Sequence, residues 1–342
     1  MNDNLFISVV TPSYNRADEL DYLLQSLSLQ TIDHNTFESI ISDDGSTDST
    51  EELVNSWKEK ASFKIKYITQ DNKGPGSARN YGLEESTGDL ILFIDSDCEA
   101  HPQWIETIVK EYHKNKFDSC GGPDGGKQDF TTLQKAIDYS MTSFFTTGGM
   151  RGHSEKMLSK FYPRTHNMGI TRNTYQALGG FGNLRHGQDI EYSHRIRKSG
   201  ANIRFIKNAL VYHRRRTSLK QFIKQVFNWG VARVNLGKID LAMLELIHFL
   251  PSIAFLSTAF LLIAMFKLGF SIKKIFLFFF LPLAVISLIG AFTKKDLGVF
   301  PLLLMVIPIQ IFGYGIGFLQ AFIRRFIFYG EELVGFKKNY YK

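Results

Sequence analysis

The chain has 342 residues, 44% of them hydrophobic and 21% charged, so it is long enough for one large domain with an attachment or for two ordinary domains. This composition excludes a disordered protein. The net charge of +7 is moderate, and its clearest basic cluster is Arg214–Arg216 rather than a long stripe. Phosphate groups and a membrane surface are therefore expected as partners, and nucleic acid is not. Two cysteines, Cys98 and Cys120, lack metal-type spacing and indicate a reducing setting.

The first residues carry neither a basic start nor a long apolar stretch, so no signal peptide is expected and the first domain should stay in the cytoplasm. An apolar, β-branched run at residues 6–10 predicts a buried strand that ends in turn-forming residues 11–15. Leucines at three- and four-residue steps predict a helix over residues 17–29, and a second strand follows at residues 37–41.

The alternation of helix and strand continues to residue 94, with helices near 49–60 and 76–85 and strands at 64–69 and 90–94. This order is typical of a parallel sheet covered by helices, and so of an α/β fold. Ligands bind such sheets at the carboxyl ends of the strands. Those ends carry Thr11, Asp44, Asp95 and Asp97. Residues 121–185 are less regular and are interpreted as loops and helices on the substrate side of the site.

Three apolar segments, 247–266, 275–292 and 297–323, are each about long enough to cross a bilayer core of about 30 Å. A helical hairpin buried in a soluble protein is the alternative, and the near absence of charge disfavours it. Before these segments, apolar positions recur at helical spacing over residues 219–234, with lysines and an arginine between them. That pattern predicts a helix that lies on the membrane surface or packs against its own domain.

Two carboxylates flank Ser96 directly after a buried strand, where Asp95 and Asp97 suit a hard divalent cation completed by a nucleotide diphosphate. An ordinary acidic turn is the alternative. His213 ends another strand-like stretch and is a candidate additional ligand for manganese, although a lone histidine is more often structural.

Asp189 stands at the start of a probable helix that runs through Ile196, where it serves either as a base or as a helix cap. A base in this position could activate a hydroxyl substrate, because a hydroxyl is a poor nucleophile until its proton is removed. The glycine-containing run Gly74–Asn80 lacks both the dinucleotide fingerprint and the P-loop lysine, but Arg79 within it could reach a donor.

Four motifs in this order, at residues 10–15, 43–48, 76–80 and 95–97, resemble glycosyltransferase family 2, the inverting transferases with a GT-A fold. The resemblance covers approximately Ile7 to Arg216. It implies that Asp189 is the catalytic base and that Asp97 and His213 bind Mn²⁺ or Mg²⁺. It also implies donor-binding and acceptor-side residues. The donor-binding residues are Thr11, Pro12, Tyr14, Asn15, Asp44, Arg79, Asp95 and Ser96; the acceptor-side residues are Asn167, Gly180, Phe181, Gln188 and Glu191.

Two departures from the family pattern stand out. Many members carry an acidic residue directly before the catalytic aspartate, whereas this chain has Gln188, which lowers the local negative charge. The Gln-x-x-Arg-Trp segment of processive synthases is also incomplete, because Gln225–Trp229 lacks the arginine. Transfer of single sugars is therefore favoured.

The sequence thus predicts a GT-A domain with a mostly parallel mixed sheet at residues 1–216, an amphipathic interfacial helix at 217–240 and a membrane domain at 241–342. The expected function is metal-dependent, inverting transfer from a nucleotide-diphosphate sugar, with a UDP-sugar favoured, to a lipid-linked or surface-glycan acceptor. The expected location is the cytoplasmic membrane, multi-pass, with the catalytic domain facing the cytoplasm. A catalytically inactive sugar-nucleotide-binding or assembly protein is the alternative, and a nucleotidyltransferase would need a phosphate loop that this chain lacks.

One difficulty with that location is the side on which the chain would end. Three full crossings would put Arg324 and Arg325 outside, against the usual cytoplasmic bias of positive charge, so one segment could be re-entrant or interfacial.

Overall fold

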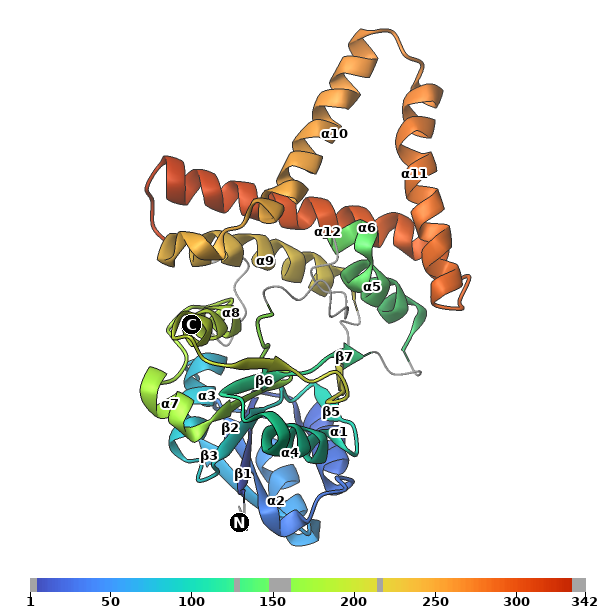
Figure 1. The fold of residues 1–342 in the computed structure, drawn as a ribbon. Helices are drawn as coiled ribbons and strands as arrows, with labels where there is room; N and C mark the ends of the chain where they lie inside the picture. Colours follow the sequence, from blue (N-terminus) through green and yellow to red (C-terminus); the bar gives the residue numbers. More distant parts are fainter. Residues whose placement is uncertain (1–4, 126–129, 148–160, 214–217, 334–342) are drawn as a thin grey trace. The chain divides into compact units, whose positions relative to one another are not determined.

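The computed structural model describes residues 5–125, 130–147, 161–213 and 218–333, and Figure 1 shows the ribbon. The described chain divides into two compact units. Residues up to 125 and residues 161–213 form the first unit, while residues 130–147 and 218–333 form the second. Each unit is described by itself below.

The first unit alternates strands and helices along the chain. Its strands are β1 (Ile7–Ser13), β2 (Phe37–Asp43), β3 (Lys64–Thr69), β4 (Leu90–Phe93), β5 (Cys98–Ala100), β6 (Ser119–Gly121), β7 (Asp124–Gly125), β8 (Met168–Thr171), β9 (Ile203–Phe205) and β10 (Val211–His213). Its helices are α1 (Ala17–Ser28), α2 (Thr50–Lys60), α3 (Pro75–Glu84), α4 (Trp104–Asn115), α7 (Arg172–Leu178) and α8 (Gln188–Lys198).

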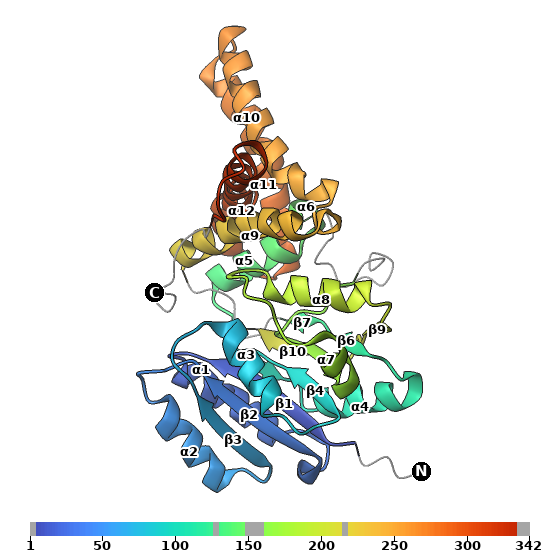
Figure 2. The same ribbon diagram turned by 90° about the vertical axis from the view of Figure 1, so that its left-hand side faces the viewer.

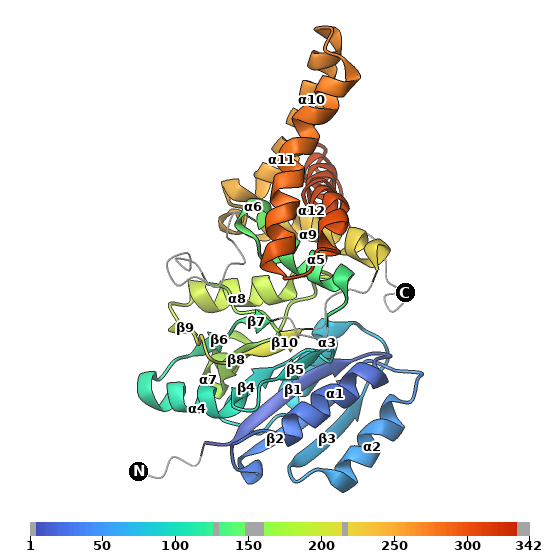
Figure 3. The ribbon, with the colours of Figure 1, turned by 90° about the vertical axis from the view of Figure 1, so that its right-hand side faces the viewer.

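The main sheet has seven strands in the order β3-β2-β1-β4-β8-β6-β9 (Figures 2 and 3). Strands β1 to β4 are parallel, whereas β8 is antiparallel to both of its neighbours. The α/β fold with a mostly parallel mixed sheet is therefore confirmed. β1 runs three residues past its expected end because its parallel register with β2 continues to the pair Ser13 and Asp43.

Two hydrophobic clusters cover the two faces of this sheet. Figures 2 and 3 show the ribbon from the two sides on which the covering helices lie. On one face, the leucines of α1 pack with Val54 of α2 and Trp104 of α4. On the other face, Leu83 of α3 packs with Tyr192 and Ile196 of α8. Each buried aliphatic side chain contributes about 1.5–3 kcal/mol. The helices α3 and α8 are thereby fixed over the same sheet face, beside the carboxyl ends of β1 and β4.

A second sheet of three short strands, in the order β5-β10-β7, follows the carboxyl end of β4. β5 begins directly after Asp97, and β10 pairs antiparallel with it so that His213 lies opposite Cys98. The backbone of His213 is thus paired with Cys98, the residue directly after the acidic turn Asp95–Asp97. The side chain of His213 lies outside the described residues.

The second unit is helical. Its helices are α5 (Thr132–Thr142), α6 (Phe144–Thr147), α9 (Leu219–Ile239), α10 (Leu250–Lys267), α11 (Ile272–Thr293) and α12 (Val299–Phe322). Three helical stretches, which contain α10, α11 and α12, are long and apolar enough to cross a membrane. They agree in position with the three apolar segments expected from the sequence.

Residues 130–147 join the helical unit, although the sequence pattern grouped them with residues 1–216. The physical reason is that the apolar face of α5, including Ile137 and Tyr139, packs against Leu303 and neighbouring side chains of α12. The predicted apolar stripe of α9 is also covered inside this unit. Phe222 and Val226 are fully buried in the same cluster, so this stripe meets α12 and its neighbours.

Candidate functional site

The loops after β1 and β2 are tied together by short polar contacts. The backbone N–H of Asn15 donates to Ser46 Oγ at 2.8 Å, and the N–H of Thr47 donates to Asn15 Oδ1 at 2.7 Å. Asn15 has a positive φ of 50°, which asparagine tolerates better than most residues. Asn15, which the sequence predicts to bind the sugar-nucleotide donor, therefore fixes the shape of two adjacent loops at the carboxyl edge of the sheet.

Asp44 is 2% exposed and organises the loop between β3 and α3. Its Oδ1 accepts hydrogen bonds from Gln70 Nε2 at 2.6 Å and from the backbone N–H of Lys73 at 2.9 Å. Its Oδ2 accepts from the N–H of Gly74 at 2.7 Å. A carboxylate bonded to two backbone amides holds the loop that leads into α3, and so sets the position of Arg79.

The remaining predicted residues of the first loop lie on and directly after β1. Thr11 and Pro12 are buried within β1, and Tyr14 follows it, half-buried. Within the described residues, Thr11 Oγ1 has no hydrogen-bond partner. A buried hydroxyl without a partner is uncommon in proteins, and its place beside the carboxyl edge is compatible with a ligand-facing role.

Arg79 and Asp95 form the best-defined ion pair of the predicted donor site. Arg79 Nη2 lies 2.6 Å from Asp95 Oδ1, and the arginine side chain is 9% exposed. The same guanidinium lies over the ring of Phe181, 5.8 Å from its centroid. A buried guanidinium with a carboxylate on one side and an aromatic face on the other is held in one orientation. Ser96 is buried beside this pair.

Carboxylates gather around Cys98, which follows Asp97 directly. Burial raises the pKa of the Cys98 thiol, and the charges of Asp97, Asp95 and Asp124 raise it further. Asp124 lies in β7, and His166 Nε2 lies 3.8 Å from its Oδ1. Oxygen donors of this kind suit Mn²⁺ or Mg²⁺, which bind through one or two carboxylates and complete their shell with phosphate and water.

Within the described ranges, no three His, Cys, Asp or Glu side chains group closely enough to hold a metal ion by themselves. Asp97 remains the carboxylate predicted from the sequence for a cation shared with a diphosphate. The proposed second ligand, the His213 side chain, lies outside the description, although its strand is fixed next to Cys98.

Asp189 lies in the first turn of α8, where the positive end of the helix dipole favours a negative charge. Its Oδ2 accepts a hydrogen bond from Arg164 Nη1 at 3.1 Å, and its side chain is 23% exposed. Burial acts to raise the pKa of Asp189, but the charge and hydrogen bond of Arg164, then the charges of Arg79 and His166, lower it overall. Asp189 is therefore ionised at neutral pH and able to accept a proton.

Gln188, the residue before the predicted base, packs on the first turn of α3. A Cβ placed on Gly76 would lie 2.2 Å from Gln188 Nε2 and 2.6 Å from its Cδ. The absence of a side chain at Gly76 therefore leaves the space that the end of the Gln188 side chain occupies. Gln188 is 9% exposed and lies between α8, which carries the predicted base, and α3, which carries Arg79.

The predicted acceptor-side segment is held by two hydrogen bonds from one side chain. Asn80 Oδ1 accepts from the N–H of Phe181 at 2.7 Å, and Asn80 Nδ2 donates to the carbonyl of Phe181 at 2.9 Å. Gly180 fits closely against Asn80, because a Cβ there would lie 2.2 Å from Oδ1. The segment is thereby fixed to α3.

Glu191 and Arg195 support the same segment from α8. Arg195 Nε donates to Glu191 Oε1 at 2.6 Å, and Arg195 Nη2 donates to the carbonyl of Gly180 at 2.6 Å. Glu191 thus orients Arg195 through a charge-assisted bond.

Asn167 differs from the other predicted acceptor-side residues because protein groups occupy its whole amide. Its Oδ1 accepts from Trp104 Nε1 at 2.9 Å, and its Nδ2 donates to the carbonyls of Pro123 and Ala209 at 3.0 and 2.7 Å. With 2% of its surface exposed, Asn167 acts as an internal tie between segments. These hydrogen bonds fix the chain directly before β8.

Arg164 is a site residue that sequence reasoning missed. It stands in an irregular segment without a motif, and its pairing with Asp189 is a tertiary contact between residues 25 positions apart. The only sequence signal was a basic residue within the irregular region before β8. Asp124 and His166 were missed for the same reason.

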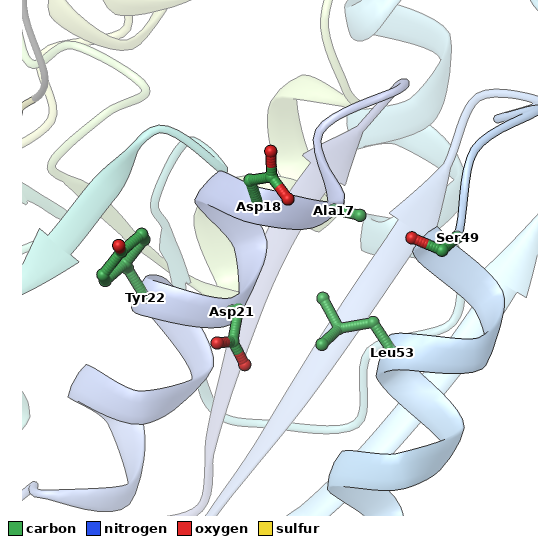
Figure 4. Close-up of a pocket in the computed structure, with 6 residues that line it drawn as sticks. All are labelled: Ala17, Asp18, Asp21, Tyr22, Ser49 and Leu53. Carbon is green, nitrogen blue, oxygen red and sulfur yellow. The ribbon is translucent and has the colours of Figure 1, made fainter.

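A separate hollow of about 470 Å³ opens between α1 and α2 (Figure 4). It is lined by Ala17, Asp18, Asp21, Tyr22, Ser49 and Leu53. The carboxylate of Asp21 accepts a hydrogen bond from Trp57 Nε1 at 2.7 Å, so it already has a protein partner. None of the predicted site residues is among this lining, and the hollow is a gap between two helices at the surface.

Parts of this sequence are similar to those of known proteins. The model of the family "Glycosyl transferase family 2" matches residues 8–178, half of the chain. Glycosyltransferase AglE of Haloferax volcanii is 26% identical over 256 residues, covering 72% of this chain and 82% of that protein. Validoxylamine A glucosyltransferase of Streptomyces hygroscopicus subsp. jinggangensis is 40% identical over 105 residues, which are 30% of this chain and 24% of that enzyme.

Solved structures share the fold as well. Mannosyltransferase PcManGT from Pyrobaculum calidifontis, in complex with GDP-Man and Mn²⁺, superposes with a TM-score of 0.66 at 15% identity, covering 92% of this chain and 87% of that chain. S. aureus TarS 1–349 in complex with UDP-GlcNAc gives 0.51 at 18% identity, covering 92% and 91%. At these identities the likeness concerns the fold alone, and it confirms the GT-A architecture.

Proposed function

Because the chain belongs to glycosyl transferase family 2, it is a glycosyltransferase, and we propose that it transfers a sugar from a metal-bound nucleotide diphosphate to an acceptor hydroxyl with inversion. Family membership rests on the match to half of the chain. The single observation that carries the proposal is the position of Arg79. Its guanidinium binds Asp95 at 2.6 Å, and its charge also lowers the pKa of Asp189. The proposed donor half and base half therefore lie within electrostatic reach of each other.

In the proposed mechanism, Asp189 accepts the proton of the acceptor hydroxyl as that oxygen attacks the anomeric carbon. General base catalysis of this kind contributes about 10²–10⁴-fold. Arg164 keeps Asp189 ionised. Asp189 lies in the first turn of α8, and Gln188 packs the start of this helix against α3. Attack on the face opposite the leaving group inverts the anomeric centre without a covalent intermediate.

A divalent cation, Mn²⁺ or Mg²⁺, would neutralise charge on the departing diphosphate. Asp97 would bind it, with His213 proposed as a second ligand because β10 pairs with β5 at Cys98. The presence of Mn²⁺ in the PcManGT structure supports testing this cation first. Arg79 and Asp95 would position the donor, while Thr11, Pro12, Tyr14, Asn15, Asp44 and Ser96 would form the nucleoside side of the site.

We propose a lipid-linked or growing surface glycan as the acceptor. The support is the helical unit, whose three apolar helices indicate membrane association and would hold the transferase where such acceptors occur. Gly180, Phe181, Gln188 and Glu191 would form the acceptor side. The proposed location is the cytoplasmic membrane with the catalytic unit facing the cytoplasm.

A panel of nucleotide sugars tests this function directly. Full-length protein in membrane vesicles is mixed with UDP-, GDP- or dTDP-sugars, with Mn²⁺, Mg²⁺ or chelator, and release of nucleotide diphosphate is measured. UDP- and GDP-sugars are tested first, since neighbours of this fold bind either UDP-GlcNAc or GDP-Man. We expect cation-dependent release with one donor class, increased by lipid-linked acceptors. Binding of a nucleotide sugar without turnover under any cation would refute the catalytic proposal and favour a binding protein.

A further inference from the structure

Length and composition make α10, α11 and α12 equal candidates for crossing a membrane, but their contacts within the helical unit differ. We propose that α10 and α11 alone cross the lipid bilayer, as a helical hairpin, while α12 lies along the membrane surface beside α9. The chain then leaves α12 on the same side as the transferase unit. Lipid would contact the whole surface of the hairpin and the exposed stripe of α12, which includes Met305 and Ile316.

The position of α9 provides the first step. Only residues 214–218 separate β10 from α9, and five extended residues span about 18 Å, less than the bilayer core of about 30 Å. α9 itself carries Lys220, Lys224, Arg233 and Lys238 in 21 residues, and it is not among the apolar spans found in the described chain. Charges of this number are costly inside a bilayer. Both ends of α9 therefore lie on the transferase side.

The end of α12 is joined to the end of α9. Asn235 Nδ2 donates to Glu332 Oε1 at 3.1 Å and to the carbonyl of Leu333 at 3.0 Å. Lys238 Nζ lies 4.8 Å from the ring centroid of Phe326. The chain after α12 is thus bound to a helix end that lies on the transferase side.

The beginning of α12 is joined to α5, which is also on that side. α5 is reached from β7 through residues 126–131, and its 11 residues make a helix only about 16 Å long. Lys135 Nζ lies 3.0 Å from Asp296 Oδ2, and Lys294 Nζ lies 2.5 Å from Asp138 Oδ2. These two ion pairs hold the turn before α12 against a helix too short and too charged to cross.

Helices α9 and α12 also pack side by side along their length. A Cβ on Gly317 of α12 would lie 2.3 Å from the carbonyl of Phe227, and one on Gly230 of α9 would lie 2.2 Å from the carbonyl of Tyr314. Glycines at such contacts allow two helix backbones to approach closely. Figure 1 shows α9 and α12 running alongside each other while α10 and α11 project away from them. A helix packed along α9 in this way shares its depth.

The ends of the hairpin agree with this arrangement. Ser252 at the start of α10 donates to the carbonyl of Gly315 at 2.9 Å, and Gly290 near the end of α11 packs on Leu303. Gly315 and Leu303 are 12 residues apart on α12, about 18 Å along its axis. If α12 crossed the bilayer, the hairpin would enter and leave at depths that differ by this amount. If α12 lies flat, both ends meet the same interface.

The hairpin itself has the properties of a spanning element. α10 and α11 have 18 and 22 residues, about 27 and 33 Å of helix, and only 6% and 17% of their apolar stretches are buried. Lys220 and Lys224 on the exposed face of α9 and Arg324 after α12 would face anionic headgroups. Two crossings also keep Arg324 and Arg325 on the side where positive charge accumulates.

Single exposed cysteines test the number of crossings in the full-length protein. Ser271→Cys lies between α10 and α11, Leu297→Cys before α12, Glu331→Cys after α12, and Lys60→Cys marks the transferase unit. Each variant is labelled with a membrane-impermeant maleimide in intact spheroplasts and in inverted vesicles. The unsubstituted protein, whose Cys98 and Cys120 are buried, gives the background. We expect residues 60, 297 and 331 to be labelled from one side and residue 271 from the other.

Labelling of residue 331 from the same side as residue 271 would mean three crossings and would overturn the proposal. Labelling of all four positions from one side would mean that the hairpin does not cross, and would overturn it equally. The result does not depend on catalysis, because it compares positions with the marker on the transferase unit.

A depth measurement provides a second, independent test. Nitroxide labels at Met305 and Ile316, both on the exposed stripe of α12, are 11 residues apart. A flat α12 places the two labels at equal depth near the headgroups, whereas a crossing α12 separates their depths by about 16 Å. A label at Phe260 of α10 provides the deep reference. Unequal depths at 305 and 316 would refute a flat α12 even if a cysteine variant failed to insert.

Discussion

Replacing Gly76 with alanine tests whether the docking of α8 on α3 positions the base. The added Cβ would lie 2.2 Å from Gln188 Nε2 and 2.7 Å from its Oε1, distances at which atoms must move. Because Gln188 is 9% exposed and begins α8, the side chain has little room to turn away without moving the helix. Overpacking of this kind costs about 1–3 kcal/mol. Asp189 is the next residue, so the displacement reaches the base directly.

The expected effect follows from that free energy. A cost of about 1–3 kcal/mol in the positioned base corresponds to a fall of about 5–150-fold in kcat/KM, since about 1.36 kcal/mol is tenfold in rate. The matched control is the double variant Gly76→Ala with Gln188→Ala, in which the new methyl group occupies space that the glutamine has left. We expect its kcat/KM to lie within about threefold of Gln188→Ala alone.

The assay is donor-dependent transfer by all four members of the cycle, with thermal unfolding measured in parallel. The coupling between the two sites should be about 1–3 kcal/mol, as expected for residues in contact. An equal loss from Gly76→Ala in both backgrounds would refute the reasoning, because it would locate the effect within α3 alone. Because overpacking also lowers Tm, the rates are compared at a temperature at which all four variants remain folded.

Three further changes probe the base, the cation and the core. In Arg164→Met the charge and hydrogen bond of the arginine are lost, so burial raises the pKa of Asp189. The acid limb of the kcat/KM profile should therefore move to higher pH, and an unmoved limb would contradict Asp189 as the base. Asp97→Asn should raise the Mn²⁺ concentration needed for half-maximal activity by at least about tenfold, measured by metal titration; an unchanged requirement would remove Asp97 as a ligand. Leu24→Ala, in the fully buried face of α1, should cost about 2–5 kcal/mol in denaturant unfolding, and a loss under about 1 kcal/mol would contradict its core position.

The sequence predicted the parallel half of the sheet well because its strands are short apolar runs that end in turn-forming and acidic residues. Strands β1 to β4 and helices α1 to α3 lie where periodicity indicated them. In the parallel arrangement that the pattern predicts, Arg79 and Asp95 lie together at one edge of the sheet. The three long apolar helices were equally predictable, since stretches of about twenty residues without charge are typical of membrane-associated helices.

Contacts made across long sequence separations could not be predicted in this way. The antiparallel insertion of β8 depends on pairing with β4, and the transfer of α5 to the helical unit depends on its face meeting α12. Arg164 reaches Asp189 only through the fold. For α9, an apolar stripe gave no information on whether lipid or another helix covers it, and the answer depended on the glycines of α12.

The most direct test of the central claim is the turnover of Asp189→Asn in full-length protein with its accepted donor, cation and acceptor. The asparagine keeps the shape of the side chain but cannot take the acceptor proton, so we expect transfer to fall by about 10²–10⁴-fold while donor affinity changes by less than about threefold. Transfer within about tenfold of the unsubstituted protein would contradict Asp189 as the base.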